Sequence, residues 1–163
     1  MLEKKDASKM LEWMHDENVV RYLQGRFGDK QIADCEKFIE SSWDDPINLH
    51  MAIVNDIDIY MGTVSLKHIS TKNKEAEFAI ALRTCAMGKG YAQYAMKQIL
   101  QRGIDEFKLD RIYWCVSPQN KRAVRFYDKN NYQRMSAIDQ QITGYTDEQI
   151  KEYIWYFFEN RNA

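Results

Sequence analysis

The chain has 163 residues, of which 45% are hydrophobic and 13% are aromatic, and its formal net charge at pH 7 is −1. This length and apolar content exclude a disordered chain and suit one core, so we expect a single domain spanning residues 1–163. The near-neutral charge argues against nucleic acid as a partner, and we expect no membrane partner because no transmembrane run is present.

The cysteines and histidines indicate neither a disulfide framework nor a metal site. Cys35, Cys85 and Cys115 are an odd number without framework spacing, and no secretion signal precedes them. These features predict a reducing, cytoplasmic location. The three histidines share no ligand spacing with the cysteines, so we expect no zinc or other metal.

The N-terminal third is expected to be mainly helical. Residues 1–5 are interpreted as the remnant of a first strand, and Asp6 is a candidate cap for a helix that ends near Met14. A loop or turn over residues 16–23 follows. Asp29 is a candidate cap for a second helix, which we expect to end near Trp43, before Pro46.

Strand patterns begin at residue 50. Residues 50–54 and 59–67 predict an antiparallel hairpin, residues 70–74 a second turn, and residues 75–82 a strand that leads into a glycine-containing loop. The remaining expected elements are a helix over 91–107, a central strand over 112–116, a helix capped by Asn120, a strand over 132–138, a short helix at 146–150 and a strand over 153–158.

The glycine loop is typical of an anion-binding site. Gly88 and Gly90 stand between an apolar strand and a helix start, where glycine backbone can approach a phosphate closely and free helix amides point at it. A P-loop is excluded because Gly90 is followed by Tyr91 and Cys85 stands where the earlier glycine is needed. The dinucleotide fingerprint fails because residue 93 is Gln.

Two motifs instead resemble the GNAT acetyltransferase superfamily. Residues 87–92, Met-Gly-Lys-Gly-Tyr-Ala, resemble its pyrophosphate loop, Gln/Arg-x-x-Gly-x-Gly/Ala, with Met87 in the first position. Residues 120–132 resemble its Asn-x-x-Ala-Ile/Val-x-Phe/Leu-Tyr-x-Lys/Arg-x-Gly-Phe/Tyr segment, with Asn131 in place of Gly. Residues 11–22 are similar to the branch that includes the ribosomal-protein N-terminal (Rim-type) acetyltransferases. The same resemblance suggests that the start is clipped or that Met1 is an internal methionine.

The resemblance implies an α+β fold, with a mixed, mostly antiparallel central sheet, helices on both faces and two splayed strands that bind acyl-CoA. Acetyl coenzyme A would be the acyl donor. Its pyrophosphate would lie on the backbone of the loop, its arm between the strands at 77–82 and 112–116, and its thioester near the amide of Leu82. The implied cofactor-binding residues are Leu82, Met87, Gly88, Lys89, Gly90, Tyr91, Ala92 and Asn120.

Direct attack by an amine requires a proton acceptor and a donor for the thiolate. Tyr127 is the candidate donor, because it shares a helix face with Asn120 and Ala123; the alternative is a core tyrosine. Glu77 is the candidate base, directly or through water; the alternative is a surface carboxylate paired with lysine. His68 is a second candidate base.

Other side chains near the expected site have simpler interpretations. Cys85 and Cys115 are expected to be packing residues, because no base and orienting group accompany them. Trp13, Tyr22 and Phe27 are candidates for the acceptor wall, with ordinary core or surface positions as the alternative.

The acceptor is expected to be a primary amine of a protein N-terminus, an amino sugar or a small molecule. The absence of acidic runs in the first helices argues against a polyamine. Alternatives are an amino-sugar-nucleotide acetyltransferase and a non-catalytic acyl-CoA sensor. We expect a monomer or a homodimer.

Overall fold

A mixed six-stranded sheet forms the centre of the computed structural model, which describes residues 1–136 and 145–160. The strands lie in the order β1-β2-β3-β4-β6-β5, and only β3 and β4 are parallel among the paired strands described. The strands are β1 (Leu49–Val54), β2 (Tyr60–Ser70), β3 (Glu75–Leu82), β4 (Arg111–Val116), β5 (Gln133–Arg134) and β6 (Ile154–Glu159).

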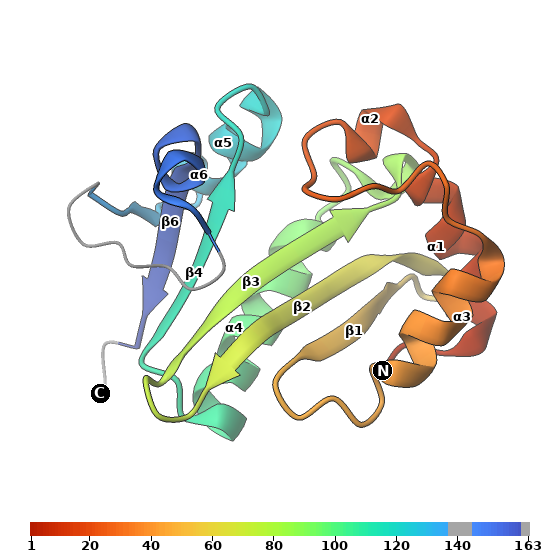
Figure 1. Cartoon of the computed structure of the whole chain (residues 1–163), viewed down its shortest axis with the longest axis horizontal. Coiled ribbons are helices and arrows are strands. Elements are labelled where there is room, and N and C mark those ends of the chain that lie inside the picture. The colour runs from red at the N-terminus through yellow and green to blue at the C-terminus, as the bar shows by residue number, and fades with distance from the viewer. Residues whose placement is uncertain (137–144, 161–163) are drawn as a thin grey trace.

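Helices cover both faces of this sheet (Figure 1). Helix α4 crosses one face, and α1 and α3 lie over β1 and β2 on the other. The helices are η1 (Lys4–Asp6), α1 (Ala7–Met14), α2 (Glu17–Val20), α3 (Ile32–Ser41), η2 (Thr84–Ala86), α4 (Tyr91–Phe107), α5 (Lys121–Lys129) and α6 (Asp147–Glu152). The expected α+β architecture is confirmed.

Two apolar clusters hold the layers together. In the larger cluster, Met96 and Ile99 of α4 pack against Leu66 of β2 and Phe78 of β3. The smaller cluster joins α1 and α3 to the opposite face of the sheet, where Tyr60 is buried. Because side chains alternate along a strand, neighbouring residues of β3 contribute to opposite faces.

Strands β3 and β4 pair over a short stretch and then separate. Their register ends at Glu77 opposite Tyr113, whereas β2 stays paired with β3 as far as Leu82. On the other side, β6 stays paired with β4 as far as Val116. Each strand is therefore held by its outer neighbour while the inner edges diverge, as the resemblance implied.

The N-terminal segment differs from the expectation. Residues 1–5 form no strand; Leu2 is buried and Lys4–Asp6 is a short 3-10 turn. The Asp6 carboxylate does not cap α1 but accepts a hydrogen bond from the Glu3 amide at 2.9 Å. This local bond competes with an extended strand, because Asp side chains readily satisfy nearby amides.

The start of α3 and the preceding turn also differ. Gln31, not Asp29, is the N-cap of α3, and Asp34 accepts from the Gln31 amide at 2.8 Å. The helix ends at Ser41, two residues earlier than expected. The expected loop at residues 16–23 contains α2, which Asp16 caps through the Asn18 amide.

The remaining element predictions agree with the structure. The hairpin between β1 and β2 is present, and so are the cap at Asn120 and the short helix expected at 146–150, which is α6. The strand expected over 132–138 is limited to Gln133–Arg134, and its residues 137 and 138 lie outside the described residues. None of the helices within the described ranges has the length and apolar character required to span a membrane.

Gly62 of β2 provides a test of the register between β2 and β3, next to the point where β3 and β4 separate. A β-carbon at Gly62 would lie 2.3 Å from the Ala81 carbonyl oxygen, so backbone would have to move. We expect Gly62→Ala to destabilise the fold by about 1–3 kcal/mol, as overpacking usually does. Thermal unfolding measures this loss, at roughly 2–4 °C for each kcal/mol.

Gly28→Ala is the matched control, because its β-carbon would meet no atom within 4 Å. Its melting temperature should stay close to that of the wild type. Equal melting temperatures for the wild type and Gly62→Ala would contradict the observed register.

Candidate active site

The glycine loop opens the N-terminus of α4 toward solvent. Gly88 and Gly90 have φ values of 75° and 87°, and Gly90 is the N-cap of α4. The first helical amide to donate within α4 is that of Tyr94, to the Gly90 carbonyl at 3.1 Å. The amides before it have no intrahelical acceptor and lie at the positive end of the helix dipole. This geometry suits an anion such as a pyrophosphate.

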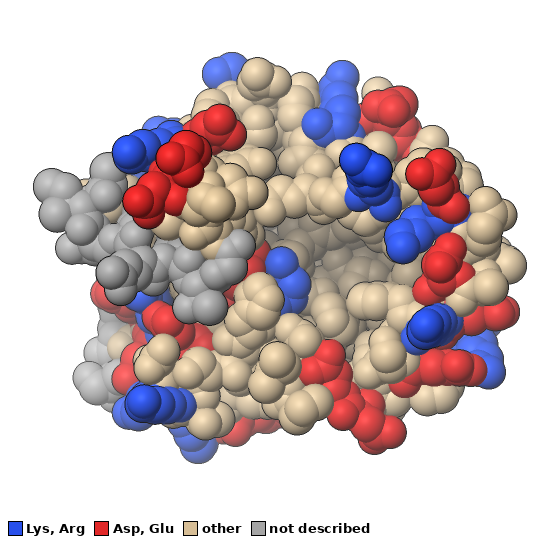
Figure 2. Space-filling model, viewed as in Figure 1, with Lys and Arg blue, Asp and Glu red and all other residues tan. Residues whose placement is uncertain are grey.

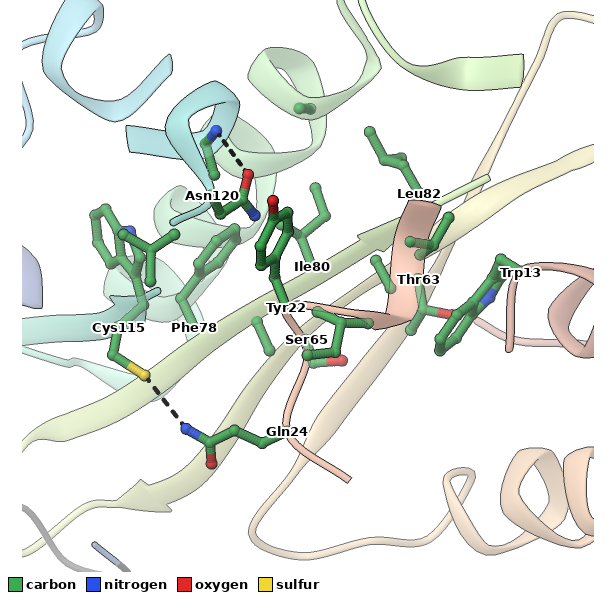
Figure 3. Close-up of a pocket in the computed structure, with 18 of the residues that line it drawn as sticks. Trp13, Tyr22, Gln24, Thr63, Ser65, Phe78, Ile80, Leu82, Cys115 and Asn120 are labelled. Carbon is green, nitrogen blue, oxygen red and sulfur yellow. Dashed lines mark hydrogen bonds between the residues drawn. The ribbon is translucent and has the colours of Figure 1, made fainter. Parts of the chain in front are cut away.

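A cavity of about 700 Å³ begins beside this loop and continues into the gap between β3 and β4. It forms the hollow on the face shown in Figure 2. Figure 3 shows side chains converging on it from the N-terminal segment, the sheet and α5. The predicted site residues that border it are Glu77, Leu82, Met87, Gly88, Ala92, Asn120 and Tyr127. Lys89 and Gly90 are exposed on the loop, and Tyr91 is half-buried in the first turn of α4.

The open edge of β3 presents backbone amides to the gap. The Arg83 amide donates to the Met61 carbonyl at 2.9 Å, toward β2. Successive amides of an extended strand point in opposite directions. The amides of Leu82 and Ile80 therefore face the gap, where a ligand with amide and carbonyl groups can pair with them.

Helix α5 places Asn120 and Tyr127 at the same cavity. The Asn120 side-chain oxygen caps the helix by accepting from the Ala123 amide at 3.2 Å (Figure 3), and its amide nitrogen has no hydrogen-bond acceptor among the described residues. Tyr127 lies among aromatic rings, with its centroid 5.4 Å from that of Trp114. Its hydroxyl has no hydrogen-bond partner among the described residues. Burial raises the pKa of Tyr127 above its usual value, so the phenol stays protonated at neutral pH.

Glu77 lies on the opposite face, where β3 and β4 begin to separate. Its side chain is 5% exposed, and its Oε1 atom accepts from Lys67 at 3.0 Å and from the Tyr145 hydroxyl at 2.7 Å. The lysine pairing considered from sequence is present, but the carboxylate is buried rather than on the surface. Two donors thus hold one oxygen of this carboxylate in place.

The second oxygen of Glu77 is less constrained. His68 Nδ1 lies 3.2 Å from Oε2, although the contact does not have hydrogen-bond geometry, and no other donor in the described residues reaches that atom. We therefore describe the two side chains as close neighbours and not as hydrogen-bonded, because distance alone does not make a hydrogen bond. His68 is half exposed, so its ring lies between the buried carboxylate and solvent.

The cysteines near the site show no features of a nucleophile. Cys115 borders the cavity, and burial raises its pKa to about 11, which keeps the thiol neutral. Cys85 is exposed, so its predicted packing role is wrong. It lies in η2, at the surface turn between β3 and the glycine loop, where no core is available to it.

The N-terminal segment supplies the other wall of the cavity. Trp13, Tyr22 and Phe27 border it, as anticipated from sequence. Trp13 and Phe27 have ring centroids 5.6 Å apart, and Trp13 Nε1 donates to the Tyr60 hydroxyl at 3.0 Å. These contacts join α1 and the following loop into one aromatic surface.

Two residues that hold Glu77 were not identified from sequence. The signal for Lys67 was available, since a hairpin around the turn at 70–74 places it opposite Glu77, as observed. Tyr145 had no such signal, because it is distant in the chain and reaches Glu77 through the tertiary fold. In residues 1–136 and 145–160, no group of three or more His, Cys, Asp or Glu side chains is arranged to hold a metal ion.

Comparisons with known proteins agree with this geometry. The family model described as Acetyltransferase (GNAT) domain matches residues 1–133. A relative described as uncharacterized N-acetyltransferase p20 from Bacillus licheniformis is 26% identical over 140 residues, which cover 84% of this chain and 79% of the relative.

Solved structures share the fold at low identity. Spermidine N-acetyltransferase from Vibrio cholerae, in complex with CoA and spermine, superposes with a TM-score of 0.79 at 18% identity, covering 97% of this chain and 92% of that one. A structure described as a probable acetyltransferase has a TM-score of 0.76 at 17% identity, covering 99% of this chain and 92% of that one. With the family model matching most of its length, this chain belongs to the GNAT acetyltransferase family and is an acyl-CoA-dependent N-acetyltransferase.

Proposed function

We propose that the chain transfers the acetyl group of acetyl coenzyme A to a primary amine by direct attack, within a single domain. The observation that carries this proposal is the gap between β3 and β4, with the glycine loop at one end, Tyr127 on one face and Glu77 on the other. The amine and the thioester can meet in this gap, with a proton donor and an acceptor on opposite sides.

The cofactor residues have distinct roles in this proposal. The backbone from Gly88 to Ala92 holds the pyrophosphate, and Lys89 adds a positive charge beside it. Met87 packs against the arm instead of donating a hydrogen bond. The open amides of β3 and the side-chain amide of Asn120 pair with the arm, and the Leu82 amide polarises the thioester carbonyl.

The proton transfers follow from the placement of the two candidate catalytic residues. The amine nitrogen forms a bond to the carbonyl carbon, and the bond between that carbon and sulfur breaks. Glu77 accepts the proton that the amine loses, directly or through water, and His68 can pass it to solvent. Tyr127 gives its proton to the departing thiolate and recovers one from solvent.

A resemblance to the Rim-type branch at residues 11–22 supports a protein N-terminus among the primary-amine acceptor classes. Spermidine and spermine are named for structural neighbours that share the fold of this chain at 18% identity. Release of the coenzyme A thiol on addition of a primary amine tests the activity. Coenzyme A binding without thiol release with any amine would favour an acyl-CoA sensor.

Gly90→Asp tests the pyrophosphate site. The carboxylate would repel the phosphate charge, and the φ of 87° strains a residue with a side chain. We expect coenzyme A affinity to fall at least roughly tenfold more than in Gly90→Asn, which has the same size and no charge. Calorimetry with coenzyme A measures both affinities. Wild-type affinity in Gly90→Asp would place the phosphate elsewhere.

Tyr127→Phe tests the proton donor. The change removes a hydroxyl that has no partner in the described part of the chain, so cofactor affinity and melting temperature should change little. We expect kcat and kcat/KM to fall together, by about 10²-fold or less, since the thiolate is a good leaving group.

Tyr132→Phe is the control for this experiment, because Tyr132 lies beside Trp114 without bordering the cavity. Its kcat should equal that of the wild type. If Tyr127→Phe retains the wild-type rate when chemistry limits turnover, another group donates the proton.

Glu77→Gln tests the base. Losing the carboxylate should lower kcat/KM most near neutral pH and least at high pH, where unprotonated amine is abundant. Glu75→Gln is the control, since Glu75 lies on the same strand and pairs with Arg111 at 2.8 Å outside the cavity. A pH–rate profile shared by wild type and Glu77→Gln would assign Glu77 a structural role.

A further inference from the structure

We infer that the acceptor is a small primary monoamine with an apolar tail, an aryl or branched alkyl group. This inference rests on the proposed function and concerns the part of the cavity between the N-terminal segment and the sheet, which we call the acceptor chamber. Its walls come from residues 13–38, and its floor is the face of β1, β2 and β3 that carries Glu77.

Large apolar side chains form the walls of the acceptor chamber. Trp13 and Phe27 contribute the tilted pair described above, and Met14 borders the same space. Phe38 lies edge-on to His50, with ring centroids 4.8 Å apart. Such surfaces stabilise an apolar group by removing it from water, and aromatic rings favour an aryl partner.

The floor of the chamber consists of small side chains. Ala79 and Ala81 of β3 lie on the same face of the strand as Glu77, and Ser65 and Thr63 lie opposite them on β2. Both hydroxyls already have partners: Ser65 pairs with His50 Nδ1 at 2.7 Å and Thr63 with the Tyr60 hydroxyl at 2.6 Å. The floor therefore leaves room for a tail without requiring it to supply polar groups.

The charges in the chamber do not complement a polycation. Asp34 and Glu77 are the carboxylates among the described residues that border the cavity. The Asp34 carboxylate accepts a hydrogen bond from the Gln31 amide at the start of α3, and Glu77 forms an ion pair with Lys67 at 3.0 Å. Burial lowers the pKa of His50, so this ring is neutral at pH 7. In Figure 2 most of the surface of the hollow is tan, and blue and red side chains stand at its margin.

One ammonium can be accommodated beside Glu77 Oε2, which accepts no hydrogen bond from the described residues. The further ammonium groups of a polyamine would find Asp34 as the one other carboxylate among the described residues that border the cavity. Burying an unpaired charge is costly, so a polyamine is disfavoured. Gln24 in the loop after α2 reaches Cys115 on β4 at 3.7 Å (Figure 3). This contact runs from the N-terminal segment to β4 on the other side of the cavity, which favours a short molecule over an extended peptide.

Thiol release at saturating acetyl coenzyme A tests the inference with a panel of acceptors. The panel contains 2-phenylethylamine, isoamylamine, ethylamine, spermidine, glucosamine and a tripeptide that begins with leucine. We expect kcat/KM for 2-phenylethylamine to exceed that for ethylamine on the order of 100-fold, because the tail enters an apolar pocket. Spermidine and the tripeptide should be poorer than both apolar monoamines.

A variant identifies the chamber as the source of this preference. Phe27→Ala should lower the ratio of kcat/KM for 2-phenylethylamine to that for ethylamine roughly tenfold. The ratio is internal to each preparation, so partial unfolding does not affect it. Tyr94→Ala is the control, since Tyr94 is an aromatic side chain that is 68% exposed and lies outside the cavity; its ratio should equal that of the wild type.

The outcomes separate the inference from the proposed function. Spermidine, glucosamine or the tripeptide turning over as well as 2-phenylethylamine would overturn the inference and leave the acetyltransferase proposal standing. An unchanged ratio in Phe27→Ala would also overturn it. Thiol release with none of these amines, while coenzyme A still binds, would overturn the proposed function and the inference together.

Discussion

The divergence of β3 and β4 after Glu77 is the constraint on which the rest of the site depends. A buried backbone group without a partner costs about 1–3 kcal/mol, so two strands seldom separate inside a protein. Here β2 holds β3 through Leu82 and β6 holds β4 through Val116, so both strands remain ordered. The backbone groups on the unpaired inner edges are free to pair with a ligand, and the outer strands β2 and β6 hold these edges in place.

The divergence also connects the two faces of the sheet. Alternation along β3 sends Phe78 to the α4 face, where Tyr127 lies, and Glu77 to the α1 and α3 face. In the proposed mechanism, the proton donor and the proton acceptor therefore approach the reaction centre from opposite sides of the sheet. A buried carboxylate needs hydrogen-bond donors, and Lys67 and Tyr145 both donate to the same oxygen of Glu77.

The two ends of the cavity differ in chemical character. The end beside Gly90 offers backbone amides and a helix dipole to an anion, and depends on backbone geometry more than on side chains. The acceptor chamber has walls of large apolar side chains from residues 13–38. Under the proposed function, substitutions in the N-terminal segment would alter acceptor preference and leave the cofactor end intact.

The sequence by itself determined the order of the main elements, the glycine loop and the α5 segment, because turn residues, helix caps and period-two strands are local signals. It therefore predicted Gly90, Asn120 and Tyr127 at one site. The local pattern at residues 1–5 predicted a strand that does not form. Instead, the Glu3 amide donates to the Asp6 carboxylate, and Leu2 is buried. Only the tertiary structure decided that Glu77 is buried, that Tyr145 holds it and that Cys85 is exposed. These properties depend on which distant segments pack together, and packing across the sheet leaves no trace in local sequence patterns.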